Sequence, residues 1–284
     1  MKTLLQLAAI AMVALFTETV NAQSTSAENS LLWEISGNGL QKPSYLYGTV
    51  HMICESDFKM TDKTRKAFGK TSKLALEVDM DDPSELAVMQ QSAMGKEPLS
   101  KTLSAEDYQK LDVFLKEKLG QGVTVFENYS LTTIMSMVML KSLACPPKVY
   151  ELEFMKMAAD KKMEIIGLEK ITAQLEFLDK AYSSKEIIEQ LQQYDADYFK
   201  ALISDYNSEQ IQKIYQMTID PKFMDAEDKK WLLDIRNKNW AAKMPELMKR
   251  ESIFFAVGAA HLEGNLGVIR LLKNAGYTVK PVMN

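Results

Sequence analysis

The chain has 284 residues, of which 46% are hydrophobic and 25% charged, a composition typical of a folded globular protein with a sizeable core. A net charge of −4 without any basic cluster excludes a surface built to bind nucleic acid. Beyond the first residues no stretch is apolar enough to cross a bilayer, so we expect no stable membrane insertion.

Residues 1–22 have the three parts of a secretory signal peptide. Lys2 supplies the positive start, Leu4–Phe16 forms an apolar run too short to span a bilayer, and Val20-Asn-Ala22 is a small-residue cleavage site. We therefore expect cleavage after Ala22, which leaves residues 23–284 as a single domain that is periplasmic or secreted.

The first part of the predicted domain is rich in strands. Alternating apolar residues in 31–36 predict one strand, and Tyr45–Val50 predicts a second, joined to the first as a hairpin. Thr61 suits the N-cap of a short helix that ends near Gly69. The apolar run Lys73–Asp79 then predicts a third strand.

Residues 83–250 are mostly helical by the periodicity of their apolar side chains. Within them, only Met163–Leu168 predicts a strand. The end of the chain reads as strand 252–257, helix 264–274 and strand 277–282. Such a βαβ unit favours a parallel pair of strands.

Two segments of the chain share one design, in which a strand is followed by a Gly-x-x-His turn, a helix and another strand. We therefore predict an α/β (α+β) fold in which two related halves, about 31–82 and 250–284, form a central mixed sheet. The helical insert, about 83–250, lies between them. It either borders the site and sets substrate choice or only covers the sheet as a packing layer.

The chain contains only two histidines, and each lies three residues after a glycine: His51 after Gly48 and His261 after Gly258. In α/β sheets ligands bind at the carboxyl ends of the strands, where these turns are expected. Either histidine alone is more simply a satisfied core or turn residue. The matched contexts of the two favour a functional pair that shares one site.

Two glutamates are candidates to join the histidines. Glu77 interrupts an apolar strand, and a buried carboxylate needs a partner. Glu169 follows the strand in the helical region, although a carboxylate at a helix start is an equal alternative. Asp79 is expected to cap the next helix. Two histidines and Glu77 suit a divalent transition metal, and without a metal they suit proton transfer with a histidine base.

Arg236 and Asn237 are candidates for substrate binding. They lie in a predicted helix between Trp231 and Trp240. An arginine among aromatic rings suits stacking or the binding of a carboxylate. The alternative is a solvated arginine on an exposed helix face.

The two cysteines, Cys54 and Cys145, are expected to form a disulfide, because an exported protein enters an oxidising compartment. Two unpaired buried thiols are the alternative. Neither cysteine suits a metal site, since no second Cys or His lies at ligand spacing from it.

Several motifs together resemble those of one known family. They are Tyr47-Gly-Thr-Val-His51, Leu76-Glu-Val-Asp79, Gly167-Leu-Glu169 with Gln174, Arg236-Asn237, and Val257-Gly-Ala-Ala-His261 with Gly276-Tyr-Thr-Val. In this order they resemble the TraB/PrgY/GumN family from about Leu32 to Val282. The resemblance implies an α/β core related to ChaN and erythromycin-esterase-like proteins. It also implies a site built from both Gly-x-x-His histidines and Glu77. The Tiki members of the family resemble peptidases that use manganese or cobalt.

Three functions remain open from the sequence. The first is an exported metal-dependent hydrolase, a peptidase that acts on peptides or proteins and whose divalent ion (Mn, Co or Zn) is held by His51, Glu77 and His261. The second is a metal-independent, esterase-like hydrolase with a histidine base, for which a small-molecule substrate is as suitable as a peptide. The third is a non-catalytic peptide- or ligand-binding protein. Neither the substrate nor the oligomeric state follows from the sequence.

Overall fold

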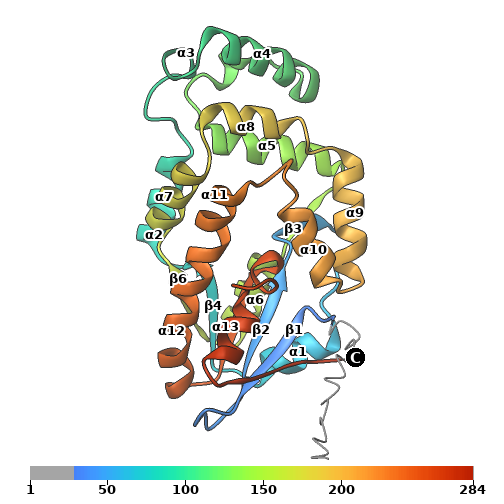
Figure 1. Cartoon of the computed structure of the whole chain (residues 1–284), viewed down its shortest axis with the longest axis vertical. Helices are drawn as coiled ribbons and strands as arrows, with labels where there is room; N and C mark the ends of the chain where they lie inside the picture. The colour runs from blue at the N-terminus through green and yellow to red at the C-terminus, as the bar shows by residue number, and fades with distance from the viewer. Residues whose placement is uncertain (1–28, 284) are drawn as a thin grey trace, which may run out of the picture.

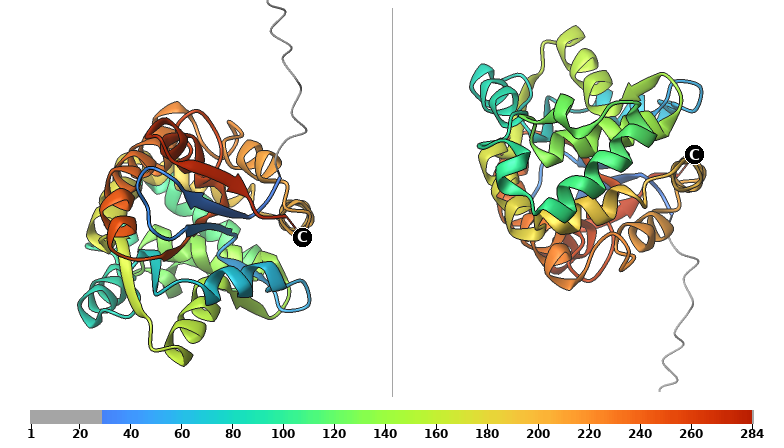
Figure 2. Two further views of the ribbon diagram at one scale, coloured as in Figure 1. Left: turned by 90° about the horizontal axis from the view of Figure 1, so that it is seen from below. Right: turned by 90° about the horizontal axis from the view of Figure 1, so that it is seen from above.

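The computed structural model describes residues 29–283 and shows a sheet with helices on both of its faces (Figure 1; Figure 2). The signal peptide expected at residues 1–22 lies outside the described part of the chain. The strands are β1 (Leu32–Ser36), β2 (Ser44–Thr49), β3 (Met52–Cys54), β4 (Lys73–Val78), β5 (Pro147–Val149), β6 (Glu164–Glu169), β7 (Ile253–Gly258) and β8 (Thr278–Pro281).

The main sheet has six strands in the order β6-β4-β7-β2-β1-β8. Its strands β6, β4, β7 and β2 run parallel, whereas β1 is antiparallel to both β2 and β8. The predicted hairpin of β1 and β2 and the predicted mixed α/β class are confirmed. Because the four parallel strands point the same way, their carboxyl ends meet at one edge of the sheet.

The prediction that the two strands of the C-terminal βαβ unit pair with each other in parallel is wrong. Strands β7 and β8 run in the same direction, but β2 and β1 lie between them. All six residues of β7 are buried, so this strand takes a central position between β2 and β4. Strand β8 has both exposed and buried positions, which suits the sheet edge. The two strands of the first half, β2 and β4, are not adjacent either, because β7 lies between them.

Helices cover both faces of the sheet. Those of the sheet layers are α1 (Asp62–Gly69), α6 (Tyr150–Asp160), α12 (Arg236–Arg250) and α13 (Val268–Asn274). Helices α1 and α6 lie on one face, and α12 and α13 on the other (Figure 2). Their buried side chains, such as Phe68, Phe154, Trp240 and Leu272, pack into one core with the strands. Thr61 caps α1 as predicted, by accepting a hydrogen bond from the backbone of Thr64.

Two helix boundaries differ from the sequence prediction. Helix α13 begins at Val268 rather than near Gly264, because residues 259–261 form a separate 3₁₀ turn and Gly264 has a φ of +95°. Asp82, not Asp79, caps α2 by accepting a hydrogen bond from the backbone of Ser84. Asp79 instead accepts one from the backbone of Asp81 in the preceding turn.

The remaining helices, together with α6 and α12, make up the helical insert. They are α2 (Pro83–Ser92), α3 (Leu99–Thr102), α4 (Ala105–Leu119), α5 (Leu131–Leu143), α7 (Ile171–Ala181), α8 (Ser184–Leu191), α9 (Ala196–Asn207), α10 (Ile211–Thr218) and α11 (Ala226–Lys229). Helices α4, α5 and α8 lie together at one end of the molecule (Figure 1). They enclose a second core around Leu111, Leu115 and Ile134. A π-helical segment, Lys230–Ile235, joins α11 to α12.

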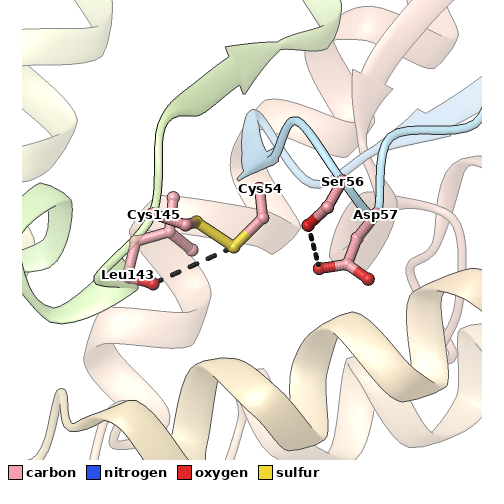
Figure 3. The surroundings of a disulfide bond; sticks show 5 residues. All are labelled: Cys54, Ser56, Asp57, Leu143 and Cys145. Atoms are coloured by element: carbon pink, nitrogen blue, oxygen red, sulfur yellow. Dashed lines mark hydrogen bonds between the residues drawn. A yellow bond between two sulfur atoms is a disulfide. The ribbon is translucent and has the colours of Figure 1, made fainter.

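A small second sheet was not expected from the sequence. Strands β3 and β5 pair antiparallel, with Cys54 opposite Pro147. A disulfide between Cys54 and Cys145 closes this pair, with the two Cα atoms 5.5 Å apart (Figure 3). The predicted disulfide is therefore confirmed, and it fastens the segment after His51 to the start of α6. Among residues 29–283, none of the helices has the length and apolar character of a membrane span.

Candidate functional site

The two Gly-x-x-His turns meet at the carboxyl ends of the parallel strands. A Cβ atom placed on Gly258 would lie 3.3 Å from Nε2 of His51, 3.4 Å from Oε1 of Glu77 and 3.4 Å from Cδ2 of His261. Side chains that follow β2, lie within β4 and follow β7 thus surround one point. The two imidazoles are therefore close enough to act at one site.

His51 lies at the exposed side of this site. Its backbone has a φ of +54°, an unusual conformation for a residue other than glycine, and 58% of its side chain is exposed. The Nδ1 atom lies 2.8 Å from Oε1 of Glu151, and Nε2 faces Gly258. Desolvation lowers the pKa of His51, but the Glu151 carboxylate outweighs this effect and raises the pKa to about 9.

His261, in contrast, is buried and held on both ring nitrogens. Asn237 donates its side-chain amide to the carbonyl of Leu266, so its Oδ1 must accept from Nδ1 of His261, at 2.6 Å. Nε2 then accepts a hydrogen bond from Nη1 of Arg236, at 3.2 Å. Burial, together with the Arg236 charge, lowers the pKa of His261 to about 3, so the ring is neutral.

Glu77 is buried between a backbone donor and a cation. Its Oε1 accepts from the backbone N–H of Gly258 at 2.8 Å, and its Oε2 accepts from Nη2 of Arg236 at 2.6 Å. The side-chain amide of Gln174 donates to the same Oε2 at 3.2 Å. Burial alone would raise the pKa of Glu77, but the charges of Arg236 and His51 hold it well below its usual range.

Arg236 links the two carboxylates of the site. Only 7% of this residue is exposed, and its guanidinium donates to Glu77 and, through Nε and Nη2, to Oε1 of Glu169. Burial raises the pKa of Glu169 despite the attraction of Arg236. Trp240 lies against both cation and imidazole, 4.8 Å from the guanidinium carbon and 4.5 Å from the ring of His261, and also donates to Glu169.

The π-helical segment before Arg236 places this side chain. π-Helical turns are rare in proteins overall, and those that occur are often found at functional sites. Nη1 of Arg236 curls back to donate to the carbonyl of Leu232, one turn earlier, at 3.1 Å. The same nitrogen therefore connects the helix backbone to His261. Arg236 is not the solvated helix-face arginine that the sequence left as an alternative.

All six residues predicted for the site are brought together by the structure: His51, Glu77, Glu169, Arg236, Asn237 and His261. The roles of Arg236 and Asn237 in substrate binding and of Glu169 in catalysis stay predictions. Sequence reasoning missed Glu151 as the partner of His51. The expected disulfide contained the signal, because it brings residue 145 and its neighbours to the His51 turn.

The side chains that were predicted to bind a metal are not arranged as a ligand set here. Within the described residues, no group of three or more His, Cys, Asp and Glu side chains is placed to hold a metal ion. Nε2 of His261 lies 3.9 Å from Oε1 of Glu77, but Arg236 holds that ring nitrogen and the other oxygen of the carboxylate. The assignment of His51, Glu77 and His261 as ligands stays a prediction.

Comparison with known proteins shows similarity along most of the chain. The sequence model of the TraB/PrgY/gumN family matches residues 31–281. Metalloprotease TIKI1 of Danio rerio is 23% identical over 316 residues, which cover 89% of this chain and 63% of that protein. Metalloprotease TIKI2 of Xenopus tropicalis is 24% identical over 321 residues, which cover 89% of this chain but only 60% of the relative. No solved structure matches the chain.

Proposed function

The chain belongs to the TraB/PrgY/gumN family, and we propose that it is a hydrolase that cleaves peptide bonds at the site of His51, Glu77 and His261. The observation that carries the proposal is the convergence of these three side chains around Gly258. The name metalloprotease, which the similar proteins carry, supports peptides or proteins as the substrate class. The chain spans less than two thirds of those relatives, so this class is proposed for the present protein rather than transferred to it.

His51 is the proton carrier in the proposed reaction. It lies at the exposed side of the site, with Nε2 toward the centre and Nδ1 on Glu151. In its neutral form Nε2 takes a proton from a water molecule whose oxygen attacks the scissile carbonyl carbon. When the C–N bond breaks, the imidazolium returns that proton to the leaving amine. Because its pKa is about 9, the rate should rise with pH toward that value.

Arg236 supplies a fixed positive charge beside this centre. It lies within hydrogen-bond distance of Glu77, Glu169 and His261, so the guanidinium cannot move without breaking several bonds. All five of its N–H groups already donate to Glu77, Glu169, Leu232 and His261, so in the proposed reaction Arg236 orients these groups rather than binding the developing oxyanion. Neutral His261 keeps the guanidinium in place without adding a second charge.

Metal dependence is our second proposal, because the similar proteins are named metalloproteases and two imidazoles with one carboxylate are donors for Mn, Co or Zn. An ion at this place would lower the pKa of a bound water and polarise the carbonyl. The side chains as arranged do not fit an ion, since Arg236 holds His261 and Glu77. No step is therefore assigned to a metal.

We also propose that the protein works in the periplasm or outside the cell. The Cys54–Cys145 disulfide supports this location, because disulfides persist in oxidising compartments. Fractionation of cells that express the full chain tests it. The protein should appear outside the cytoplasm with both cysteines oxidised, and a cytoplasmic protein with two free thiols would contradict the proposal.

The test of activity is a peptide library incubated with purified, untagged protein and followed by mass spectrometry. We expect cleavage, with His51→Ala lowering the rate by about a hundredfold or more, as removal of a general base does. Lys238→Ala is the matched control, because Lys238 is exposed on the same helix as Arg236. Equal cleavage by His51→Ala contradicts the role of His51. A bound peptide without turnover contradicts the hydrolase and favours a binding protein.

Elemental analysis of protein purified without chelator separates the two proposals on metal. A stoichiometric divalent ion that is lost in His51→Ala, together with activity that chelation abolishes, supports metal dependence. Full activity in protein without metal contradicts it and leaves the histidine mechanism in place.

A further inference from the structure

One buried carboxylate, Glu151, contacts the proton carrier His51 without touching the reacting centre. Glu151 lies in the first turn of α6 and only 7% of it is exposed. Its Oε1 accepts two hydrogen bonds, one from Oγ1 of Thr49 at 2.7 Å and one from Nδ1 of His51 at 2.8 Å. A buried carboxylate needs such partners to remain charged.

The chemistry of these contacts fixes the form of the His51 ring. An ionised carboxylate only accepts hydrogen bonds, so Nδ1 must carry a proton. In the neutral ring Nε2 is then the unprotonated nitrogen, and this atom faces Gly258 and Glu77. Carboxylates that hold the outer nitrogen of a working histidine set its tautomer and orientation.

The fold holds Glu151 against His51 by several independent links. The backbone N–H of Tyr150 donates to the carbonyl of His51 at 3.0 Å. Strands β3 and β5 pair directly between the two residues, and the disulfide closes the far end of that pair (Figure 3). His51 itself is held in the left-handed region of the backbone. Such conformations persist only where the surrounding structure enforces them.

We propose that Glu151 is a positioning residue, which keeps the His51 ring in the Nδ1–H form and directs Nε2 to the reacting centre. The antiparallel pair of β3 and β5, with its disulfide, is the support that carries it. The inference rests on the proposed function, in which His51 moves the proton. The state of the ring can be measured without any substrate, so the two claims fail separately.

The experiment uses the untagged protein labelled with ¹⁵N-histidine, in which only two imidazoles give signals. His261→Gln identifies the signals of His51. In alkaline solution, where the ring is neutral, His51 should carry its proton on Nδ1. In Glu151→Gln the carboxamide can either accept or donate, so both tautomers should appear. In Glu151→Asp the acceptor-only group should retain the Nδ1–H form.

Glu153→Gln is the matched control, because Glu153 lies on the same helix and pairs with Lys148 rather than with the site. It should leave both rings unchanged. On the cleaved peptide, Glu151→Gln should lower kcat about 10- to 100-fold with KM within about threefold, and Glu151→Asp should recover part of the loss.

Two results overturn the inference. One is an Nε2–H tautomer for His51 in the wild-type protein. The other is a Glu151→Gln protein whose ring stays wholly Nδ1–H. If the ring responds as expected but the wild-type protein cleaves no peptide, the positioning role stands and the proposed hydrolase fails.

Discussion

The two Gly-x-x-His turns share a sequence pattern and a place in the sheet, yet their histidines are chemically opposite. The side chain of His51 is 58% exposed, and its pKa is raised to about 9. That of His261 is 6% exposed, and its pKa is lowered to about 3. At neutral pH the first ring is therefore charged in the free protein and the second is not.

Partners from the helical insert produce this difference. Glu151, from the start of α6, gives His51 a carboxylate, whereas Arg236 and Asn237, from α12, give His261 a cation and an amide. The turns bring the rings together, and these partners from the insert decide which ring is protonated at neutral pH. The insert is thus part of the site in addition to being a packing layer.

The largest expected effect comes from removing the cation that sets the state of His261. Arg236→Met leaves the Glu77 and Glu169 carboxylates buried without their shared partner. Breaking a buried ion pair in this way costs about 3–5 kcal/mol. We expect denaturant unfolding to show a loss of this size, with loss of peptide cleavage.

Lys229→Met is the control, because Lys229 pairs with Asp234 in the same helical run but at a partly exposed position. A surface pair of this kind contributes about 0–1 kcal/mol. Equal unfolding free energies for the two variants would show that Arg236 does not hold the carboxylates together.

The glycines of the two turns give the next comparison. A Cβ on Gly48 would lie 2.7 Å from Leu262 Cδ1 and 3.0 Å from Ala259 Cα, so this glycine lets the turns pack. Gly48→Ala should therefore lower the unfolding free energy by about 1–3 kcal/mol, a typical overpacking cost.

Gly258→Ala should act mainly on the reaction. Its Cβ would meet the side chains of His51 and Glu77 at 3.3 and 3.4 Å rather than the packed turn. We expect a stability loss below about 1 kcal/mol but a fall in peptide cleavage of about tenfold or more, since small displacements of reacting groups are costly. If Gly48→Ala and Gly258→Ala lower stability and peptide cleavage to the same extents, the predicted difference between the two glycines is wrong.

The smallest expected effect is the pH dependence of stability due to His51. Its folded pKa of about 9 lies above the ordinary value of 6.5, so protonation stabilises the folded state. The contribution is complete below about pH 6.5 and is lost as the pH rises through about 9. Because the side chain is largely exposed, solvent screening limits it to about 1 kcal/mol. His51→Gln should remove this part of the pH profile measured by denaturant unfolding.

The outcome at these two turns shows what local sequence can predict. Strand periodicity and the two Gly-x-x-His motifs were sufficient to predict that His51, Glu77 and His261 meet, because parallel strands end at one edge. The Cys54–Cys145 pair followed from the cysteine count and the expected export. These features depend on short stretches of chain and on one simple rule of sheet geometry.

The features that the sequence did not predict depend on distant pairings. The place of β7 between β2 and β4 is set by which strand can be buried on both sides, a property of the whole sheet. Glu151 has the pattern of an ordinary acidic residue at a helix start, which the helix dipole favours by itself. Its contact with His51 depends on the pairing of β3 with β5, three residues each, too short to recognise by alternation.

The most direct test of this account is a pH titration of the two ¹⁵N-labelled imidazoles, assigned with His51→Gln. One ring should titrate at about pH 9, and the other should remain neutral down to about pH 3. Two rings that both titrate near the ordinary value of 6.5 would contradict the claim that partners from the insert make the two histidines chemically different.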